Sequence, residues 1–218
     1  MQVDEGRNGG SIDESSPATP KAPANRRPQV RGPLVGAQRM GWHLVIHPGF
    51  AEPLLTLASA VDRQRREGRA DFENSPKAKL LKRVLDVILV EIPTFPMASQ
   101  YEQGNTLGAD ARGWRRAKFL GRFRLFFRFD TASKVIVYAW MNDENTLRKA
   151  GASSDPYAVF RKMLIDGNPP HDWSKLLDAC RTPPDTQQKL AGLTGNLAPV
   201  PQSREVTPKA TKPRRRKS

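Results

Sequence analysis

The stretch RGWRRAKFLGRFRLFFR, residues 112–128, decides the fold of this chain. It contains seven basic residues and no acidic residue. From Phe123 onward, apolar side chains occupy every second position and arginines lie between them, except at Phe126. This period of two predicts a β-strand with one buried face and one face that carries guanidinium groups. Because like charges held side by side repel one another, an ordinary solvated face mixes signs, so a single-sign face predicts contact with a polyanion.

The segments on either side of this stretch predict a small α+β domain over residues 40–180. Strands are expected at residues 42–47, 115–120, 122–129 and 135–140. Two amphipathic helices follow the first strand, the second capped by Ser75-Pro76, and a last helix begins at Asp155-Pro156. The expected order is therefore β-α-α-β-β-β-α. Strands joined by short turns are antiparallel neighbours, and one apolar face of this antiparallel or mixed sheet should pack on the helix pair.

Residues 1–39 and 181–218 are expected to be disordered tails. Both contain many prolines and few large apolar side chains, so burial cannot offset the entropy lost on ordering them. The second tail has nine Lys or Arg against two acidic residues, a balance of +7. Its end, Arg214-Arg215-Arg216-Lys217, predicts a non-specific electrostatic anchor for RNA or the ribosome. An anionic membrane surface is a weaker alternative, and no membrane partner is predicted.

Charge and cysteine content narrow the class of protein. The 218 residues carry a formal net charge of +14, which predicts a polyanionic partner. The single cysteine, Cys180, excludes a disulfide framework and any zinc site built on several thiolates. No run of about 18 apolar residues could span a membrane, and the first residues lack a signal-peptide pattern. We therefore expect a cytoplasmic protein.

Several motifs resemble those of the YhaV toxins, which belong to the RelE-like superfamily of toxin–antitoxin endoribonucleases. The longest is the run Trp-Met-Asn-Asp-Glu-Asn-Thr-Leu-Arg at residues 140–148. Shorter matches are Gly41-Trp42, His47-Pro48, Lys118-Phe119, Arg124-Leu125-Phe126-Phe127-Arg128, Pro169-Pro170 and Asp172-Trp173. The resemblance covers residues 41–179 and neither tail. It implies a RelE-like fold and an enzyme that cleaves mRNA, mostly on translating ribosomes, neutralised by a PrlF-like antitoxin in a hetero-oligomer.

The resemblance also implies catalytic residues. RelE-like enzymes place an arginine in an aromatic-Arg-Leu motif on a central strand, and residues 123–125 match it, so Arg124 is predicted to stabilise the transition state. Lys118, on the preceding strand, is predicted to clamp phosphate, with general-base action as the alternative. Arg148 corresponds to the family's basic residue after the last strand, with Lys149 as its alternative. Tyr157 corresponds to the tyrosine of the final helix, although a core position is equally compatible with the sequence.

Further basic and polar residues are predicted to bind RNA around these four. They are Arg115, Arg116, Arg122, Arg128 and Asn142. Arg128 could instead make a structural pair, because it lies further along its strand. Asn142 could read a base edge.

Cleavage of RNA needs little beyond these groups. The 2′-hydroxyl is tethered beside the phosphorus that it attacks, so no metal and no cofactor are predicted. His43 and His47 lie four apart on one strand, about 13 Å from each other, which is too far to share a metal. The alternative function is a non-catalytic RNA- or ribosome-binding protein that uses the same basic sheet.

Overall fold

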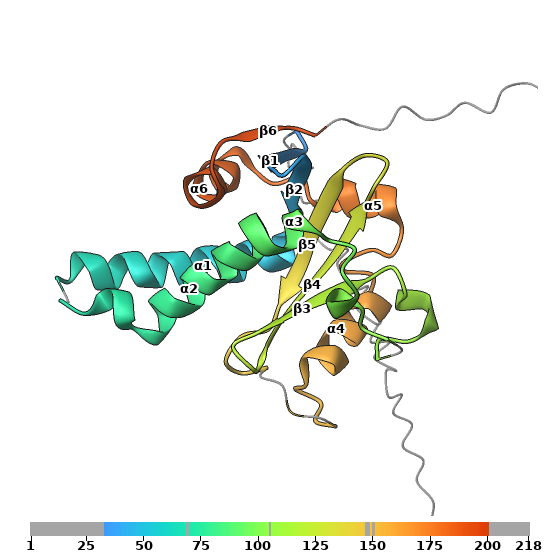
Figure 1. The fold of residues 1–218 in the computed structure, drawn as a ribbon, viewed down its shortest axis with the longest axis horizontal. Helices are drawn as coiled ribbons and strands as arrows, with labels where there is room; N and C mark the ends of the chain where they lie inside the picture. Colours follow the sequence, from blue (N-terminus) through green and yellow to red (C-terminus); the bar gives the residue numbers. More distant parts are fainter. Residues whose placement is uncertain (1–32, 69, 105, 147–148, 150, 201–218) are drawn as a thin grey trace, which may run out of the picture. The chain divides into compact units, whose positions relative to one another are not determined.

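The computed structural model describes residues 33–200 except residues 69, 105, 147, 148 and 150. In this part of the chain, six strands form one sheet in the order β3-β4-β5-β2-β1-β6 (Figure 1). The strands are β1 (Val35–Arg39), β2 (Trp42–Ile46), β3 (Arg115–Phe119), β4 (Phe123–Asp130), β5 (Val135–Met141) and β6 (Leu197–Pro199). All neighbours are antiparallel except β2 and β5, which are parallel. The predicted α+β class and the antiparallel β3-β4-β5 run are confirmed.

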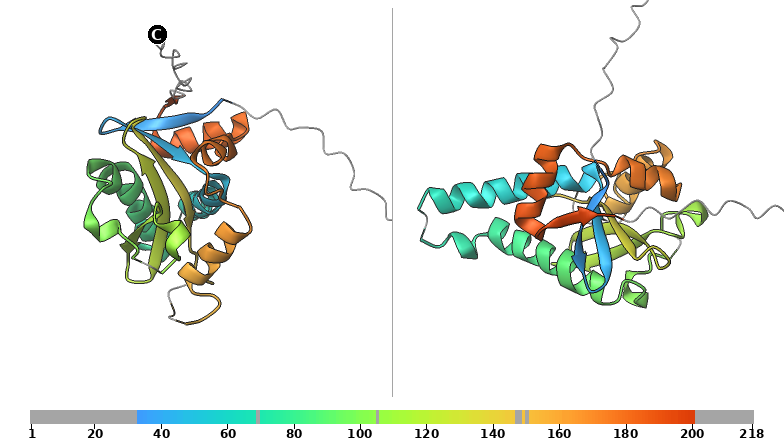
Figure 2. Two further views of the ribbon diagram at one scale, coloured as in Figure 1. Left: turned by 90° about the vertical axis from the view of Figure 1, so that its right-hand side faces the viewer. Right: turned by 90° about the horizontal axis from the view of Figure 1, so that it is seen from above.

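Helices flank both faces of this sheet (Figure 2). They are α1 (Pro48–Arg66), α2 (Pro76–Asp86), the π-helix η2 (Val87–Glu91), α3 (Ile92–Thr94), α4 (Pro156–Ile165), α5 (Trp173–Ala179) and α6 (Pro184–Thr194). Three short 3-10 helices also occur: η1 (Phe72–Asn74), η3 (Ser99–Tyr101) and η4 (Ala109–Ala111). The predicted caps are present: Ser75 accepts a hydrogen bond from Ala78 N, and Asp155 accepts one from Tyr157 N.

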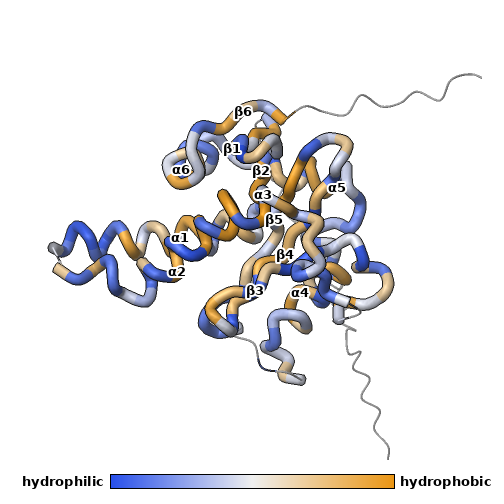
Figure 3. The backbone as a smooth tube through the Cα atoms, viewed as in Figure 1, coloured by the Kyte–Doolittle hydropathy of each residue, from blue (hydrophilic) through white to orange (hydrophobic). Residues whose placement is uncertain are grey.

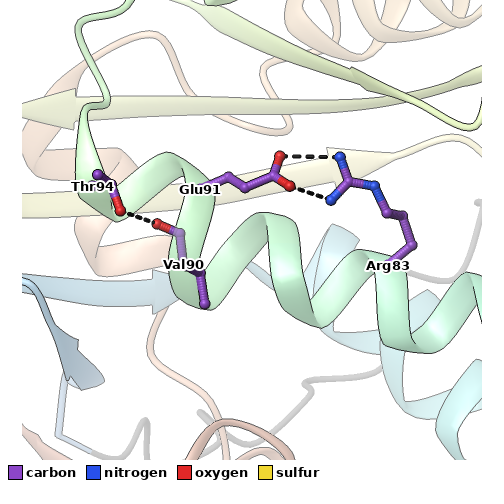
Figure 4. Close-up of polar contacts among 4 residues, drawn as sticks. All are labelled: Arg83, Val90, Glu91 and Thr94. Atoms are coloured by element: carbon purple, nitrogen blue, oxygen red, sulfur yellow. Dashed lines mark hydrogen bonds and ion pairs between the residues drawn. The ribbon is translucent and has the colours of Figure 1, made fainter.

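The α1–α2 pair extends away from the sheet, and polar residues gather toward its far end (Figure 3). The end of the pair next to the sheet makes specific contacts with β5 and across η2. The hydroxyl of buried Tyr138 on β5 donates to Ile88 O over 2.6 Å. Across η2, Arg83 pairs with both carboxylate oxygens of Glu91, and Thr94 Oγ1 donates to Val90 O over 2.6 Å (Figure 4). These contacts fix the end of the helix beside the sheet.

The sheet buries apolar side chains on both of its faces. Leu125, Phe127, Ile136 and Tyr138 face the core shared with α1 and α2. Phe126, Val137 and Ala139 face a second core with Phe160 and Leu176 of α4 and α5. The prediction of one apolar face packed on the helix pair is therefore incomplete. Phe126, which interrupts the arginine series, stacks on Phe160 at 4.2 Å, and the β4–β5 register shifts between Phe126 and Phe127.

The predicted disorder is wrong near both boundaries of the 40–180 domain. Residues 35–39 form β1, and α6 and β6 lie within the segment predicted to be a disordered tail from residue 181. The reason is a long-range pairing: β6 hydrogen-bonds to β1, and Leu190 and Val200 are buried. Arg39 also donates to Thr194 O over 2.6 Å. With β1, α5, α6 and β6 added, the order is longer than the predicted one. The Arg214–Lys217 cluster lies outside the described residues.

His47 makes the stability of this fold sensitive to acid. It follows β2 and caps α1, where its Nδ1 accepts from Gly49 N at 3.1 Å, and it is buried. Burial lowers the pKa of His47 from 6.5 to about 4, although a hydrogen bond to the Ala139 backbone opposes this shift. The unfolded chain therefore binds the proton more tightly than the folded one. The free energy of unfolding should decrease by about 3 kcal/mol as the pH falls from 6.5 to 4.

Urea unfolding of the native protein and of His47→Gln at pH 7 and pH 4.5 measures this effect. We expect the substitution to remove most of the loss, because glutamine does not titrate. His171→Gln, a change at an exposed histidine, should keep the native pH dependence. Equal losses in the native protein and in His47→Gln would contradict the assignment.

Candidate functional site

The β3–β4 hairpin brings the two principal predicted residues together. Lys118 lies directly opposite Arg124 in the register, so the two side chains project from the same face of the sheet. Lys118 is exposed, whereas Arg124 is only 7% exposed. The Arg124 Nη1 donates to Gly121 O at 2.9 Å and to Phe123 O at 2.7 Å, which holds the guanidinium against its own turn.

The charge of Arg124 is not neutralised within the described part of the chain. No carboxylate there forms an ion pair with it, and its Nε is buried without a hydrogen-bond partner. Buried donors are nearly always paired in folded proteins, so an unpaired one requires an explanation. A phosphate oxygen is a ligand that a guanidinium binds strongly. Arg124 therefore has the chemistry of an anion-binding group.

Tyr157 reaches the same face from α4. Its hydroxyl accepts a hydrogen bond from Arg116 Nε at 2.5 Å, and Arg116 Nη1 donates to Gln100 O at 3.1 Å. Its ring is buried and lies edge-on to Phe126 at 5.6 Å. The two predicted alternatives for Tyr157 are thus combined, with the ring in the core and the hydroxyl at the surface of β3. Arg116, Lys118, Arg124 and Tyr157 together form the candidate site.

An aromatic layer lies beside Lys118 and Arg124 on the same face of the sheet. Trp140 stacks with Phe126 at 5.9 Å and with Phe160 at 6.0 Å, and Trp114 packs edge-on to Phe160 at 5.1 Å. Trp140 is half-buried and packs against this second core. The contribution of Phe126 was not predicted. Its interruption of the alternating arginines is the signal in the sequence that marks it.

Asn142 is fully buried, and its side chain is bonded to the protein itself. The amide oxygen accepts from Arg124 N at 2.5 Å, and the amide nitrogen donates to Thr146 O at 3.0 Å and Arg122 O at 3.3 Å. The predicted contact between Asn142 and RNA is therefore wrong for this structure, because no part of the amide reaches the surface.

Arg128 and Arg115, which were predicted to bind RNA, make contacts within the protein. Arg128 donates to His171 O, and its guanidinium carbon lies 5.5 Å from the ring centroids of both Trp114 and Trp173. Burial lowers the pKa of Arg128, and the charge of Asp172 opposes that shift. The structural alternative for Arg128 is thus the one observed.

Arg115 faces the opposite side of the sheet from Lys118. It forms an ion pair with Glu102 at 3.2 Å and lies over Phe129. Arg122 remains exposed in the β3–β4 turn, beside the candidate site. Arg148 lies outside the described residues, and its alternative Lys149 is exposed in the loop before α4.

Lys118 is exposed at the candidate site, whereas Arg124 and Tyr157 are largely buried. Two grooves of about 710 and 580 Å³ flank α1, and Arg116, Lys118, Arg124 and Tyr157 line neither of them. A cationic site outside these grooves suits an extended polyanion better than a small molecule, which usually binds in a concave pocket. Among the residues described, no three His, Cys, Asp or Glu side chains cluster closely enough to hold a metal ion. Within the same ranges, no helix has the length and apolarity to cross a membrane.

Comparison with known proteins gives consistent matches. A family model described as "Toxin with endonuclease activity, of toxin-antitoxin system" matches residues 44–181. The ribonuclease toxin YhaV of Escherichia coli K12 is 41% identical over 138 residues, which are 62% of this chain and 90% of that protein. Toxins named YhaV from Escherichia coli O6:H1 and O157:H7 share the same identity and coverage. No solved structure matches the chain.

Proposed function

The chain belongs to the YhaV family of endoribonuclease toxins, which act in toxin–antitoxin systems, and from this premise we propose that it cuts mRNA by metal-independent attack of a 2′-hydroxyl on the adjacent phosphate. The alternative of a non-catalytic RNA-binding protein is not retained, because the family has endonuclease activity. The single observation that carries the proposal is the cross-strand pair of Lys118 and Arg124, in which a buried, unneutralised guanidinium lies beside an exposed ammonium.

We assign Arg124 the role of stabilising the negative charge that develops on the phosphate during the reaction. As the 2′-oxygen attacks in line, the non-bridging oxygens gain negative charge that a fixed cation stabilises. The guanidinium of Arg124 is fixed by its bonds to Gly121 O and Phe123 O, so little reorganisation is needed during the reaction. Lys118, opposite it, clamps a phosphate oxygen, and the proton of the attacking 2′-hydroxyl passes to a solvent water molecule. Arg122, exposed at the turn, holds the neighbouring phosphate.

Tyr157 is assigned to the leaving 5′-oxygen. Its hydroxyl oxygen receives a hydrogen bond from Arg116 Nε, which fixes the position of the hydroxyl. The hydroxyl gives its proton to the alkoxide as the P–O bond breaks. Arg116 thus acts on the reaction through Tyr157, and the aromatic layer under α4 keeps the hydroxyl in place. Arg148, which corresponds to the family's basic residue after the last strand, remains a proposed catalytic residue.

The partners follow from charge and family. A net charge of +14 favours association with ribosomal and messenger RNA, so we propose that cleavage takes place mainly on translating ribosomes in the cytoplasm. The toxin–antitoxin family implies an antitoxin, which we propose is PrlF-like and binds the toxin in a hetero-oligomer. The order of β2 to α4, with α4 packed on one face of β4, supports the proposed RelE-like fold.

Mapping of new 5′ ends on a reporter mRNA tests the proposal. Purified protein is incubated in chelator, with and without translating ribosomes, beside Lys118→Ala. Discrete new ends are expected from the native protein in chelator, and more of them with ribosomes. Removal of the Lys118 charge should slow cleavage on the order of 10²-fold.

Lys79→Ala is the matched control, because Lys79 is an exposed lysine on α2, away from the candidate site. Its rate should equal that of the native protein. Absence of new ends in chelator, with full activity once a divalent cation is restored, would contradict metal independence. Equal cleavage of free and translating mRNA would contradict the role of the ribosome.

A further inference from the structure

Asn142 pairs with Arg124 in place of a regular strand residue. The β4–β5 ladder reaches Met141, which lies opposite Leu125. One residue further on, Asn142 N donates to Arg124 O at 3.3 Å, and Asn142 Oδ1 accepts from Arg124 N at 2.5 Å. A single residue therefore binds both backbone groups of Arg124, one through its own backbone and one through its side chain. The backbone of β5 is thereby released to turn away.

The other half of the same amide holds the two segments next to Arg124. Asn142 Nδ2 donates to Arg122 O at 3.3 Å in the hairpin turn and to Thr146 O at 3.0 Å in the loop after β5. That loop is closed by Asp143, whose Oδ1 accepts from Asn145 N at 2.9 Å and Thr146 N at 3.0 Å. Asn142 is fully buried, so these bonds are made without competition from water. One amide thus connects the hairpin turn, the first residues of β4 and the loop.

We infer that Asn142 is a positioning residue that sets the orientation of Arg124 in the reaction; this inference rests on the function proposed for Arg124. The guanidinium is held to carbonyls of its own turn, at Gly121 and Phe123, so its direction depends on the backbone of residues 121–124. That backbone is held in turn by Asn142 at Arg122 and Arg124. A displacement of about 1 Å in a reacting geometry can lower a rate by about 10²-fold.

The position requires an amide. Asn142 accepts from Arg124 N and donates to carbonyl oxygens within one side chain. Aspartate is almost the same size, but an ionised carboxylate has no hydrogen to donate and would face the carbonyls of Arg122 and Thr146. Asn142→Asp therefore removes the donating half while it keeps the acceptor, the volume and the burial.

A double-mutant cycle on the rate of RNA cleavage separates positioning from a general structural effect. Single-turnover kcat and KM are measured for the native protein, Asn142→Asp, Arg124→Ala and the double variant, with folding checked by circular dichroism. We expect Asn142→Asp to lower kcat by about 10²-fold with KM nearly unchanged. In the Arg124→Ala background the same change should have almost no further effect, because it acts through Arg124.

Asn196→Asp is the matched control, since it makes the same chemical change on an exposed side chain between α6 and β6, outside the network around Arg124. It should keep native kcat. Asn142→Gln, which keeps the amide but lengthens the side chain, supplies a second comparison if Asn142→Asp does not fold. Losses that multiply in the double variant would overturn the inference while leaving the role of Arg124 intact. Full activity of Arg124→Ala would instead refute the proposed function, and this inference with it.

Discussion

Replacement of Arg124 by alanine should lower kcat for RNA cleavage by about 10²- to 10³-fold, the loss usually seen when one fixed transition-state donor is removed. The guanidinium is largely buried and has no carboxylate partner within the residues described, so its charge is not neutralised by that part of the protein. RNA affinity should fall much less than kcat, because the exposed Lys118 and Arg122 remain. Single-turnover cleavage and filter binding on the same RNA measure the two effects.

Two further variants define what the site requires from Arg124. Arg124→Lys keeps the charge but loses the planar, bidentate donor geometry, so it should restore only part of the rate. Arg65→Ala removes an exposed arginine that pairs with Asp62 on α1, and it should leave kcat unchanged. Thermal unfolding shows whether each variant is folded at the assay temperature. Equal, gradual losses of affinity from both arginine-to-alanine changes, with kcat unaffected, would contradict the assignment.

Phe160→Ala should reduce the free energy of unfolding by about 3–5 kcal/mol, the usual range for a buried phenylalanine. Phe160 is completely buried, stacks on Phe126 at 4.2 Å and contacts Trp114 and Trp140. It attaches α4 to the sheet, and α4 carries Tyr157. The cavity left by the missing ring should therefore make the position of the Tyr157 hydroxyl less fixed and also destabilise the domain. Urea unfolding gives the stability, and cleavage at a temperature where the variant is folded gives the activity.

Ile165 offers a matched control on the same helix. Its side chain is 75% exposed, so Ile165→Ala should change the free energy of unfolding by no more than about 0.5 kcal/mol. A loss below about 1 kcal/mol for Phe160→Ala would mean that α4 is not held to the sheet by this aromatic layer.

Much of the fold could be predicted because its signals are local. The period of two in residues 122–129 marks a strand and separates its arginines from its core side chains. Ser75-Pro76 and Asp155-Pro156 mark two helix starts, and both serine and aspartate do cap their helices. Lys118 and Arg124 were predicted to lie on neighbouring strands, and the observed register pairs them directly.

The residues whose contacts the sequence did not determine depend on distant parts of the chain. Asn142 has the chemistry of a base reader, but it is buried against the start of β4. Arg128 shares the face of Arg124, yet two tryptophans and the backbone of His171 enclose it. Arg115 lies on the other face, beside Glu102. None of these partners is near in the sequence, so no local pattern could indicate them.

Periodicity, capping residues and charge thus determined that the chain forms an α+β domain with a cationic hairpin and a capped helix bearing Tyr157. Each of these properties arises from a few consecutive residues, and their physical chemistry is nearly independent of the rest of the chain. Long-range packing decided which cations remain available, that β6 orders by pairing with β1, and that Tyr157 meets Arg116. Those outcomes come from contacts between segments that are far apart in the chain. Such contacts can stabilise the protein only after the sheet has brought the segments together.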